Sequence, residues 1–380
     1  MDFELDDVQQ EFVRLAHNFG EKKLAPTIME RDHKGIYDEN LIQELLDMGM
    51  GGIYFPEQYA GAEADVLSYI LVVEELAKYD AGVSITLSGT VSLCANPIWQ
   101  FGTDAQKEKY LTPLCEGTKL GAFGLTEPNA GTDASGQQTV ATKDENGDYI
   151  LNGSKIFITN GGAADIYVVF AMTDKSKGNH GITAFIIEKD MPGFTFGKKE
   201  DKMGIHTSQT EELIFQDVKV PKENLLGQEG KGFKIAMMTL DGGRIGVAAQ
   251  ALGIAEAALA DAVEYSKQRV QFGRPICKFQ SVSFKLADMK MQIEAARNLV
   301  YKAATRKQAG IPFSIDAAIA KRVASDVAMR VSTEAVQIFG GYGYSEEYPA
   351  ARHMRDAKIT QIYEGTNEVQ LMVTAGSLLR

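Results

Sequence analysis

The chain has 380 residues, of which 44% are hydrophobic and 24% are charged, and its formal net charge is −12. This composition is typical of a soluble globular protein, and the length predicts two or three domains. Because an acidic protein repels a phosphate backbone, nucleic acid is not an expected partner, although a few local cations suffice to bind the phosphates of a small molecule.

The cysteines and the N-terminus indicate a compartment. Cys94, Cys115 and Cys277 show no CxxC spacing, so neither disulfides nor a metal site is expected, and a reducing environment is indicated. The N-terminal sequence MDFELDD is acidic and lacks the core of a signal peptide. No apolar run approaches the ~18 residues that span a bilayer. We therefore expect a cytoplasmic protein with no membrane segment, although the mature form of an organellar protein would look the same.

Residues 1–120 are predicted to form a helical domain. Asp6 and Gln9 have the spacing of a capping box, and apolar residues then recur every three or four positions up to Phe19. The same period returns over residues 41–48 and 67–79, with glycine-rich loops between the periodic segments.

Residues 121–230 are predicted to form a β domain. Asn146 and Gly147 between apolar flanks predict a hairpin. Runs of β-branched and aromatic residues predict strands over 149–151, 156–158, 166–170 and 182–187, with others near 194 and over 213–215.

Residues 231–380 are predicted to be helical again. Long periodic segments over 233–266, 279–308 and 314–339 predict a C-terminal four-helix bundle. The order helical, β, helical predicts an α+β fold class. No GxGxxG follows a strand, so a nicotinamide cofactor is not expected.

Six segments contain residues suited to binding or chemistry: LTEPNAGTDASG (125–136), KIFITNGG (155–162), TLDGGRIGVAAQALG (239–253), RVQFGRPICKFQ (269–280), QIFGGYGYSEEYP (337–349) and RDAKITQIYEGTNEVQ (355–370). In the first, tight turns aim successive backbone N–H groups at an anion. In the second, Phe157 and Phe123 are suited to flank a planar ring, and Thr159 to hydrogen-bond to it. Taken alone, these two segments also fit an interdomain loop and a buried strand.

The next three segments combine glycine with charged residues. Two glycines lie beside Asp241 and Arg244 in a helical pattern, where each costs roughly 1 kcal/mol, so close approach of another body is indicated. Arg269 and Arg274 flank a turn, and arginine presents a fork that suits phosphate. The fifth segment ends a helix in a glycine-rich turn. For the first of these three, the alternative is a helix start with a solvated charge pair, and the other two are weak signals when taken alone.

The last segment contains a candidate base. Glu364 stands in a turn between two helical stretches, beside Ile362 and Tyr363 and before Gly365. A carboxylate that such neighbours desolvate has a raised pKa, as a general base requires. For this residue taken alone, a surface glutamate is the alternative.

Together the six segments resemble the acyl-CoA dehydrogenase family over essentially the whole chain. TEPNAGTD, ITNGG, DGGRIG, RVQFG, GGYGY and IYEGT occur in the family's order and at its spacings. The resemblance is closest to the short-chain, butyryl-type branch of anaerobic bacteria. It implies an N-terminal helical domain, a middle β domain, a C-terminal bundle, a homotetramer and one FAD per subunit.

The resemblance also implies site residues. Positions that contact flavin and pyrophosphate match Phe123, Thr126, Thr132, Phe157, Ile158 and Thr159. Positions that bind the FAD of a neighbouring subunit match Arg269, Phe272, Gln280, Gln337, Gly340 and Gly341, and positions after the base that touch FAD match Thr366 and Glu368. Substrate-binding positions match Thr132, Asp241, Arg244, Tyr363 and Gly365. Many relatives carry Trp where this chain has Phe157, so the cover over the flavin edge differs from theirs.

The family's chemistry assigns the role of base to Glu364, which removes the α-proton of an acyl-CoA thioester while the β-hydrogen leaves as hydride to flavin N5. Some branches place the base where this chain has Gly243, and glycine cannot serve. Gln250 and Thr360 match residues that close the acyl pocket in butyryl-type members, so we expect conversion of butyryl-CoA to crotonyl-CoA.

Because the chain has no nicotinamide motif and no cysteine cluster, an external electron carrier is needed, and the resemblance implies an electron-transfer flavoprotein, which is the family's usual carrier. Three alternatives stand beside this interpretation. They are a member with another chain-length preference, an acyl-CoA oxidase, whose chains are typically much longer, and a non-enzymatic flavoprotein of this fold that binds nucleic acid. The acidic charge and the intact Glu364 argue against the last.

Overall fold

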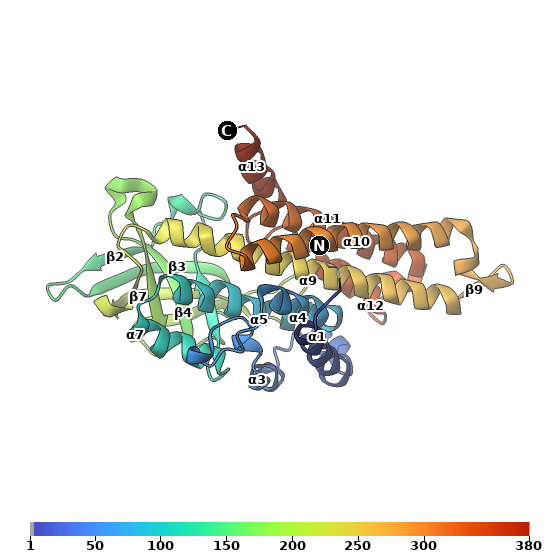
Figure 1. Cartoon of the computed structure of the whole chain (residues 1–380), viewed down its shortest axis with the longest axis horizontal. Coiled ribbons are helices and arrows are strands. Elements are labelled where there is room, and N and C mark those ends of the chain that lie inside the picture. The colour runs from blue at the N-terminus through green and yellow to red at the C-terminus, as the bar shows by residue number, and fades with distance from the viewer. Residues whose placement is uncertain (1–3, 380) are drawn as a thin grey trace.

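The computed structural model describes residues 4–379 as three consecutive groups of elements, first helical, then β, then helical (Figure 1). This order confirms the predicted α+β fold class. The sheet lies at one end of the long axis, and the long C-terminal helices run from it to the other end. The first three residues of the acidic N-terminal stretch and residue 380 lie outside the described part.

The N-terminal helices follow one another over residues 7–115. Their bounds are α1 Asp7–Phe19, α2 Ile28–Lys34, α3 Glu39–Asp47, α4 Val66–Tyr79, α5 Ala81–Ser88, α6 Asn96–Phe101, α7 Asp104–Gln106 and α8 Thr112–Cys115, with π-helical turns at Gly20–Leu24, Gly89–Ala95 and Lys107–Leu111. The predicted capping box starts α1, because the Asp6 carboxylate accepts from the Gln9 amide at 2.8 Å and the Gln9 side chain accepts from the Asp6 amide at 3.1 Å.

The middle residues form an eight-stranded sheet in the order β6-β7-β3-β2-β4-β5-β8, with β1 added parallel to β4. The bounds are β1 Gly121–Gly124, β2 Val140–Lys143, β3 Tyr149–Thr159, β4 Ile166–Met172, β5 Ile182–Glu188, β6 Phe194–Lys199, β7 Thr210–Val220 and β8 Leu225–Leu226. The predicted hairpin joins β2 to β3, and Gly147 in its turn has φ of 84°. Strand β4 is buried on both faces, because Val168 and Phe170 pack toward the helices while Tyr167 and Val169 pack within the β layer.

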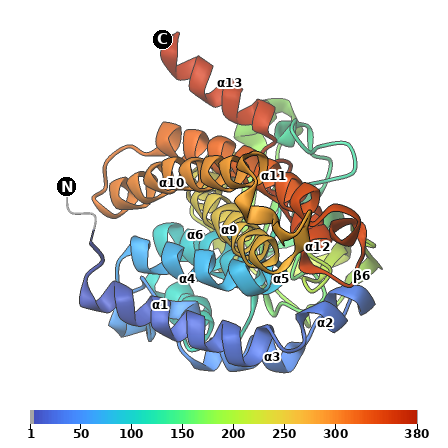
Figure 2. The same ribbon diagram turned by 90° about the vertical axis from the view of Figure 1, so that its right-hand side faces the viewer.

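The C-terminal helices form the predicted bundle (Figure 2). Their bounds are α9 Gly232–Gln268, α10 Gln280–Gln308, α11 Ser314–Phe339, α12 Pro349–Thr360 and α13 Asn367–Leu378, and a small hairpin of β9 Val270–Gln271 and β10 Arg274–Pro275 joins α9 to α10. Helix α13 leaves the bundle and projects away from it.

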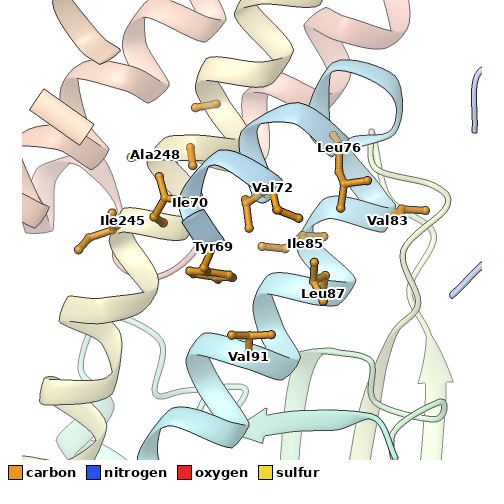
Figure 3. Close-up of a cluster of buried hydrophobic side chains, with 14 of the residues drawn as sticks. Tyr69, Ile70, Val72, Leu76, Val83, Ile85, Leu87, Val91, Ile245 and Ala248 are labelled. Carbon is orange, nitrogen blue, oxygen red and sulfur yellow. The ribbon is translucent and has the colours of Figure 1, made fainter. Parts of the chain in front are cut away.

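The core between the N-terminal helices and the bundle is formed where α4 and α5 pack on α9. Figure 3 shows Ile70 of α4 beside Ile245 and Ala248 of α9. The glycines of α9 permit this close packing, since a Cβ on Gly253 would lie 2.2 Å from the carbonyl oxygen of Glu74 in α4. Close approach of another group was predicted for the two glycines beside Asp241 and Arg244, and at Gly243 that group is the Glu364 side chain, since a Cβ there would lie 2.0 Å from its Oε2.

One expectation from the sequence needs correction. A stretch of α9 is long and apolar enough to cross a membrane, although no such run was expected. The reason is that α9 is the central core helix of the bundle, and 72% of that stretch is buried inside the protein.

Candidate active site

The candidate base lies in the turn between α12 and α13. Glu364 and Gly365 both have positive φ, 53° and 90°, which is uncommon for a glutamate and indicates that the surroundings impose this conformation. Arg244 of α9 supports the turn, because its Nε donates to the Glu364 carbonyl oxygen at 3.4 Å while its Nη1 pairs with Asp241 at 2.6 Å. The turn therefore holds the Glu364 side chain against α9.

The Glu364 carboxylate has no hydrogen-bond partner for its buried Oε2 in the described part of the chain. Burial raises the pKa of this carboxyl to about 7, and the nearby cations of Arg244 and Lys321 lower it only in part. A carboxylate that is desolvated, unpaired and poised near neutrality is suited to take a proton from a weak carbon acid.

Glu364 is on the wall of a cavity of about 190 Å³ between the sheet and the bundle. Among the residues predicted for the site, those that line this cavity are Phe123, Thr126, Thr132, Phe157, Ile158, Thr159, Arg244, Tyr363, Glu364 and Gly365. Their elements are β1, the loop after it, β3, α9 and the turn before α13. The structure therefore brings together residues that lie far apart in the sequence.

Phe157 stands at a β-bulge in β3. The pairing with β7 shifts register between Lys155 and Ile158, and Phe157 has φ of 58°. A bulge re-aims a side chain away from the regular alternation of a strand. The phenyl ring is 60% exposed and lines the cavity, where it can flank a planar ligand.

The cavity also offers hydroxyl groups. The side chains of Thr126, Thr132 and Thr159 form no hydrogen bond with any other residue of the described chain. Hydroxyls that line a cavity without a protein partner are available to a ligand, since each can donate and accept. A flat apolar ring with polar heteroatoms at its edges fits this lining.

One buried residue behind this lining was missed in the sequence. Lys155 is fully buried, and its Nζ donates to the Glu127 carboxylate at 2.7 Å and to the Gln137 side chain at 2.9 Å. Glu127 also accepts from the Thr139 amide at 3.0 Å, so this ion pair closes the loop that carries Thr126 and Thr132. A lone lysine at an inward position of a period-two strand was the available signal.

Two residues predicted to close an acyl pocket do not line the cavity. Gln250 is fully buried; it donates to the Ala81 carbonyl at 2.8 Å and accepts from the Tyr363 hydroxyl. It therefore lies behind Tyr363, which does line the cavity. Thr360 is buried in the last turn of α12 and donates to the Ala357 carbonyl at 2.7 Å.

A second group of predicted residues lies far from the cavity, where the bundle ends in the β9–β10 hairpin (Figure 1). These residues are exposed and are Arg269, Phe272, Gln280, Gln337, Gly340 and Gly341. Phe272 is 94% exposed with φ of 51°, and the Arg269 guanidinium lies 5.6 Å from the centre of the Tyr342 ring. Within one chain this group does not reach the cavity.

Thr366 and Glu368, the two predicted residues after the base, begin α13. Thr366 caps the helix by accepting from the Val369 amide at 3.4 Å, and Glu368 is exposed. Asp241 is half-buried, and burial raises its pKa.

Comparison with known proteins gives the same family for all three parts of the chain. Residues 6–118, 122–218 and 230–379 match the N-terminal, middle and C-terminal domains of acyl-CoA dehydrogenase. The chain is 84% identical to the short-chain specific acyl-CoA dehydrogenase of Megasphaera elsdenii over the full length of both.

Solved structures agree with this result. The fold is similar to butyryl-CoA dehydrogenase from Megasphaera elsdenii, with a TM-score of 0.99, 84% identity and full coverage of both chains. It is equally similar, with a TM-score of 0.99, 66% identity and full coverage, to a chain in a structure described as the electron transferring flavoprotein of Acidaminococcus fermentans.

Proposed function

Because the chain belongs to the acyl-CoA dehydrogenase family, we propose that it dehydrogenates a short-chain acyl-CoA, with butyryl-CoA as the preferred substrate and crotonyl-CoA as the product. The observation that carries the proposal is the Glu364 carboxylate, which is desolvated and unpaired on the wall of the cavity. The high identity to short-chain relatives supports the chain length.

The family's cofactor is FAD, which accepts the β-hydrogen of the substrate as a hydride when it is bound. The cavity fits its ring system, because Phe157 offers an exposed ring and three threonine hydroxyls have no partner among residues 4–379. We assign Phe123, Phe157 and Ile158 to the apolar contacts of the ring. Thr126, Thr132 and Thr159 are assigned to its heteroatoms and pyrophosphate.

The proton step is assigned to Glu364. Its carboxylate removes the α-proton of the thioester as the β-hydrogen departs, so the two C–H bonds are replaced by the trans double bond of the enoyl product. Negative charge develops on the thioester oxygen and needs a fixed donor. The backbone N–H of Glu364 donates to no acceptor in the described residues, so it is free to bind that oxygen. Arg244, which pairs with Asp241, holds the turn, and we assign both residues to substrate contacts.

The exposed residues at the far end of the bundle are assigned to a neighbouring subunit. We propose a homotetramer in which Arg269, Phe272, Gln280 and the Gln337–Gly341 turn of one subunit complete the FAD site of another. This accounts for exposed aromatic and glycine-rich surface that nothing covers within one described chain. Residues 1–120, 121–230 and 231–380 are proposed as the three domains of each subunit, and the cytoplasm as their location.

The electrons are proposed to pass to an electron-transfer flavoprotein. The similarity to a chain from an electron transferring flavoprotein structure supports this partner. The test mixes the purified enzyme anaerobically with butyryl-CoA and then adds either the flavoprotein or air. We expect rapid loss of the oxidised flavin absorbance, fast reoxidation by the flavoprotein and slow reoxidation by air. Rapid turnover in air with stoichiometric hydrogen peroxide would instead identify an acyl-CoA oxidase, and absence of flavin reduction would leave a non-enzymatic flavoprotein.

A further inference from the structure

The turn that carries the candidate base rests on a buried lysine of the neighbouring helix. Lys321 of α11 is fully buried, and its Nζ donates to the Gly365 carbonyl oxygen at 2.9 Å and to Oδ1 of Asn367 at 3.0 Å. Both acceptors lie within three residues of Glu364. The ammonium therefore contacts the turn that carries Glu364 from the α11 side, through two of the three residues that follow Glu364.

The acceptors of Lys321 are themselves fixed. The Asn367 amide donates to Ser325 at 2.9 Å and to Asp326 at 2.8 Å, both one turn along α11 from Lys321. The Gln370 side chain of α13 donates to the same Gly365 carbonyl at 2.8 Å. The turn is thus held on α11 from one side and on α13 from the other.

The chemistry of this lysine differs from that of the other fully buried lysine near the cavity. Lys155 has the Glu127 carboxylate at 2.7 Å, whereas the hydrogen bonds of Lys321 go to a carbonyl and an amide oxygen. Burying an ammonium is costly, and neutral dipoles offset less of that cost than a carboxylate does. A stabilising ion pair is therefore a poor explanation for Lys321, and a role in the site explains it better.

We propose that Lys321 is a positioning residue for the reaction, resting on the proposed function of Glu364 as the base. Its ammonium binds the Gly365 carbonyl and the Asn367 side chain and so fixes the turn. Glu364 and Gly365 thereby keep their left-handed conformation, and the Glu364 carboxylate points at α9. The residue acts through the turn and does not touch the substrate.

Lys321 also acts on the charge of the base. The charged groups that face Glu364 are Arg244 from α9 and Lys321 from α11, while the Tyr69 and Tyr363 hydroxyls face it from α4 and from its own turn. Lys321 is faced in turn by Glu364, Arg244, Asp326 and Glu368. Burial lowers the pKa of Lys321 to about 7, so its ammonium is fully present on the acid side of neutrality, and there both cations favour the ionised carboxylate. Loss of the Lys321 charge should therefore raise the pKa of the base and move the acid limb of the pH profile upward.

The test compares Lys321→Met, Lys321→Gln and Lys321→Arg with Arg330→Gln, which removes an exposed charge from the same helix and serves as the matched control. For Lys321→Met we expect kcat with butyryl-CoA to fall at least about tenfold with little change in KM, since a misplaced base slows chemistry more than binding. The acid limb of kcat/KM should move up by about one pH unit. Lys321→Gln, which retains a donor, should show the shifted limb, and Lys321→Arg, which retains the charge, should not.

A second measurement is independent of turnover. Hydrogen exchange in the holoenzyme should become faster in the segment that spans residues 361–367 in Lys321→Met and remain as in the wild type in Arg330→Gln. Unchanged exchange together with an unmoved acid limb would overturn the proposal. So would parallel loss of FAD, native size and activity in both Lys321→Met and Lys321→Gln, because the role would then be structural. Retained activity in Glu364→Gln would refute the proposed base but leave the exchange result for Lys321 standing.

Discussion

The carboxylate of Glu364 occupies the space that a side chain on Gly243 would need. A Cβ built on Gly243 would lie 2.0 Å from Oε2 of Glu364 and 2.7 Å from Cδ2 of Leu93. Positions 243 and 364 therefore meet at one point, although they lie on different elements. This proximity supports the proposed role of Glu364, because a base at position 243 and a base at position 364 would place a carboxylate in the same location.

Gly243→Ala should therefore displace the base. The added methyl group collides with the carboxylate, so we expect flavin reduction by butyryl-CoA to slow by about a hundredfold, as when a catalytic group is misplaced by about 1 Å. Gly242→Ala is the matched control, because its Cβ meets only the flexible end of Lys307 at 3.0 Å. Both changes raise helix propensity by roughly 1 kcal/mol, so the difference between the two variants reports the collision at position 243. Equal activity of the two variants would contradict the contact.

Removal of the base should abolish the chemistry without removing the cofactor. In Glu364→Gln we expect flavin reduction by butyryl-CoA, followed by stopped-flow absorbance, to fall by about a thousandfold, with full FAD content. In the wild type, kcat/KM should fall as the pH drops through the base pKa of about 7, because only the ionised carboxylate accepts the proton. Near-normal reduction in the variant would refute the assignment.

The same carboxylate should destabilise the folded protein at high pH. Its pKa is raised from an ordinary value of 4.5, so the folded state binds this proton more tightly than the unfolded state does. Stability is therefore lost as the pH rises from 4.5 through about 7, and the penalty is complete above that. Glu364→Gln should melt at a higher temperature than the wild type at about pH 8, with a difference that shrinks toward pH 5. The exposed Glu347→Gln variant should show no such trend.

The sequence predicted the elements more readily than the contacts between them. The capping box at Asp6, the Asn146-Gly147 hairpin and the long bundle helices depend on local patterns, and the structure has them where they were expected. Contacts between distant segments leave no local pattern. The β-bulge at Phe157 depends on the register of β3 against β7, and the place of Gln250 behind Tyr363 depends on how α9 packs.

The buried lysines show the same limit. Lys155 and Lys321 each lie at an inward position of a periodic pattern, and neither was singled out from the sequence. Their partners, the Glu127 carboxylate and the Gly365 carbonyl, are brought near only by the fold. A lysine at a buried position of a periodic segment is therefore a usable signal for a site, but the sequence does not identify the groups that the lysine binds.

Arg269→Ala should weaken FAD retention and the oligomer together. The side chain is exposed at the far end of the bundle, where we assign it to the pyrophosphate of a neighbouring subunit's FAD, and its only ring contact in the described chain is with Tyr342. Lys267→Ala is the matched control, since this exposed lysine ends the same helix and pairs loosely with Glu264 at 3.8 Å. Flavin content and light scattering measure the outcome. A variant with full flavin and native size would exclude the intersubunit role.

The acyl pocket should favour short chains. Tyr363 forms part of the cavity wall, and it is held there by Gln250, which is anchored in turn on the Ala81 carbonyl. Each additional buried methylene would normally contribute about 0.8 kcal/mol, or roughly a fourfold gain in kcat/KM, if the pocket could accept it. A fixed wall cannot accept the longer acyl tail, so the gain is lost and the tail does not fit. We therefore expect kcat/KM to fall from butyryl-CoA to octanoyl-CoA. Gln250→Ala frees the Tyr363 ring and should reduce the fall, whereas Thr360→Ser, which keeps the buried hydroxyl, should not. A wild-type kcat/KM that rises steadily to octanoyl-CoA would show that Tyr363 does not limit the tail.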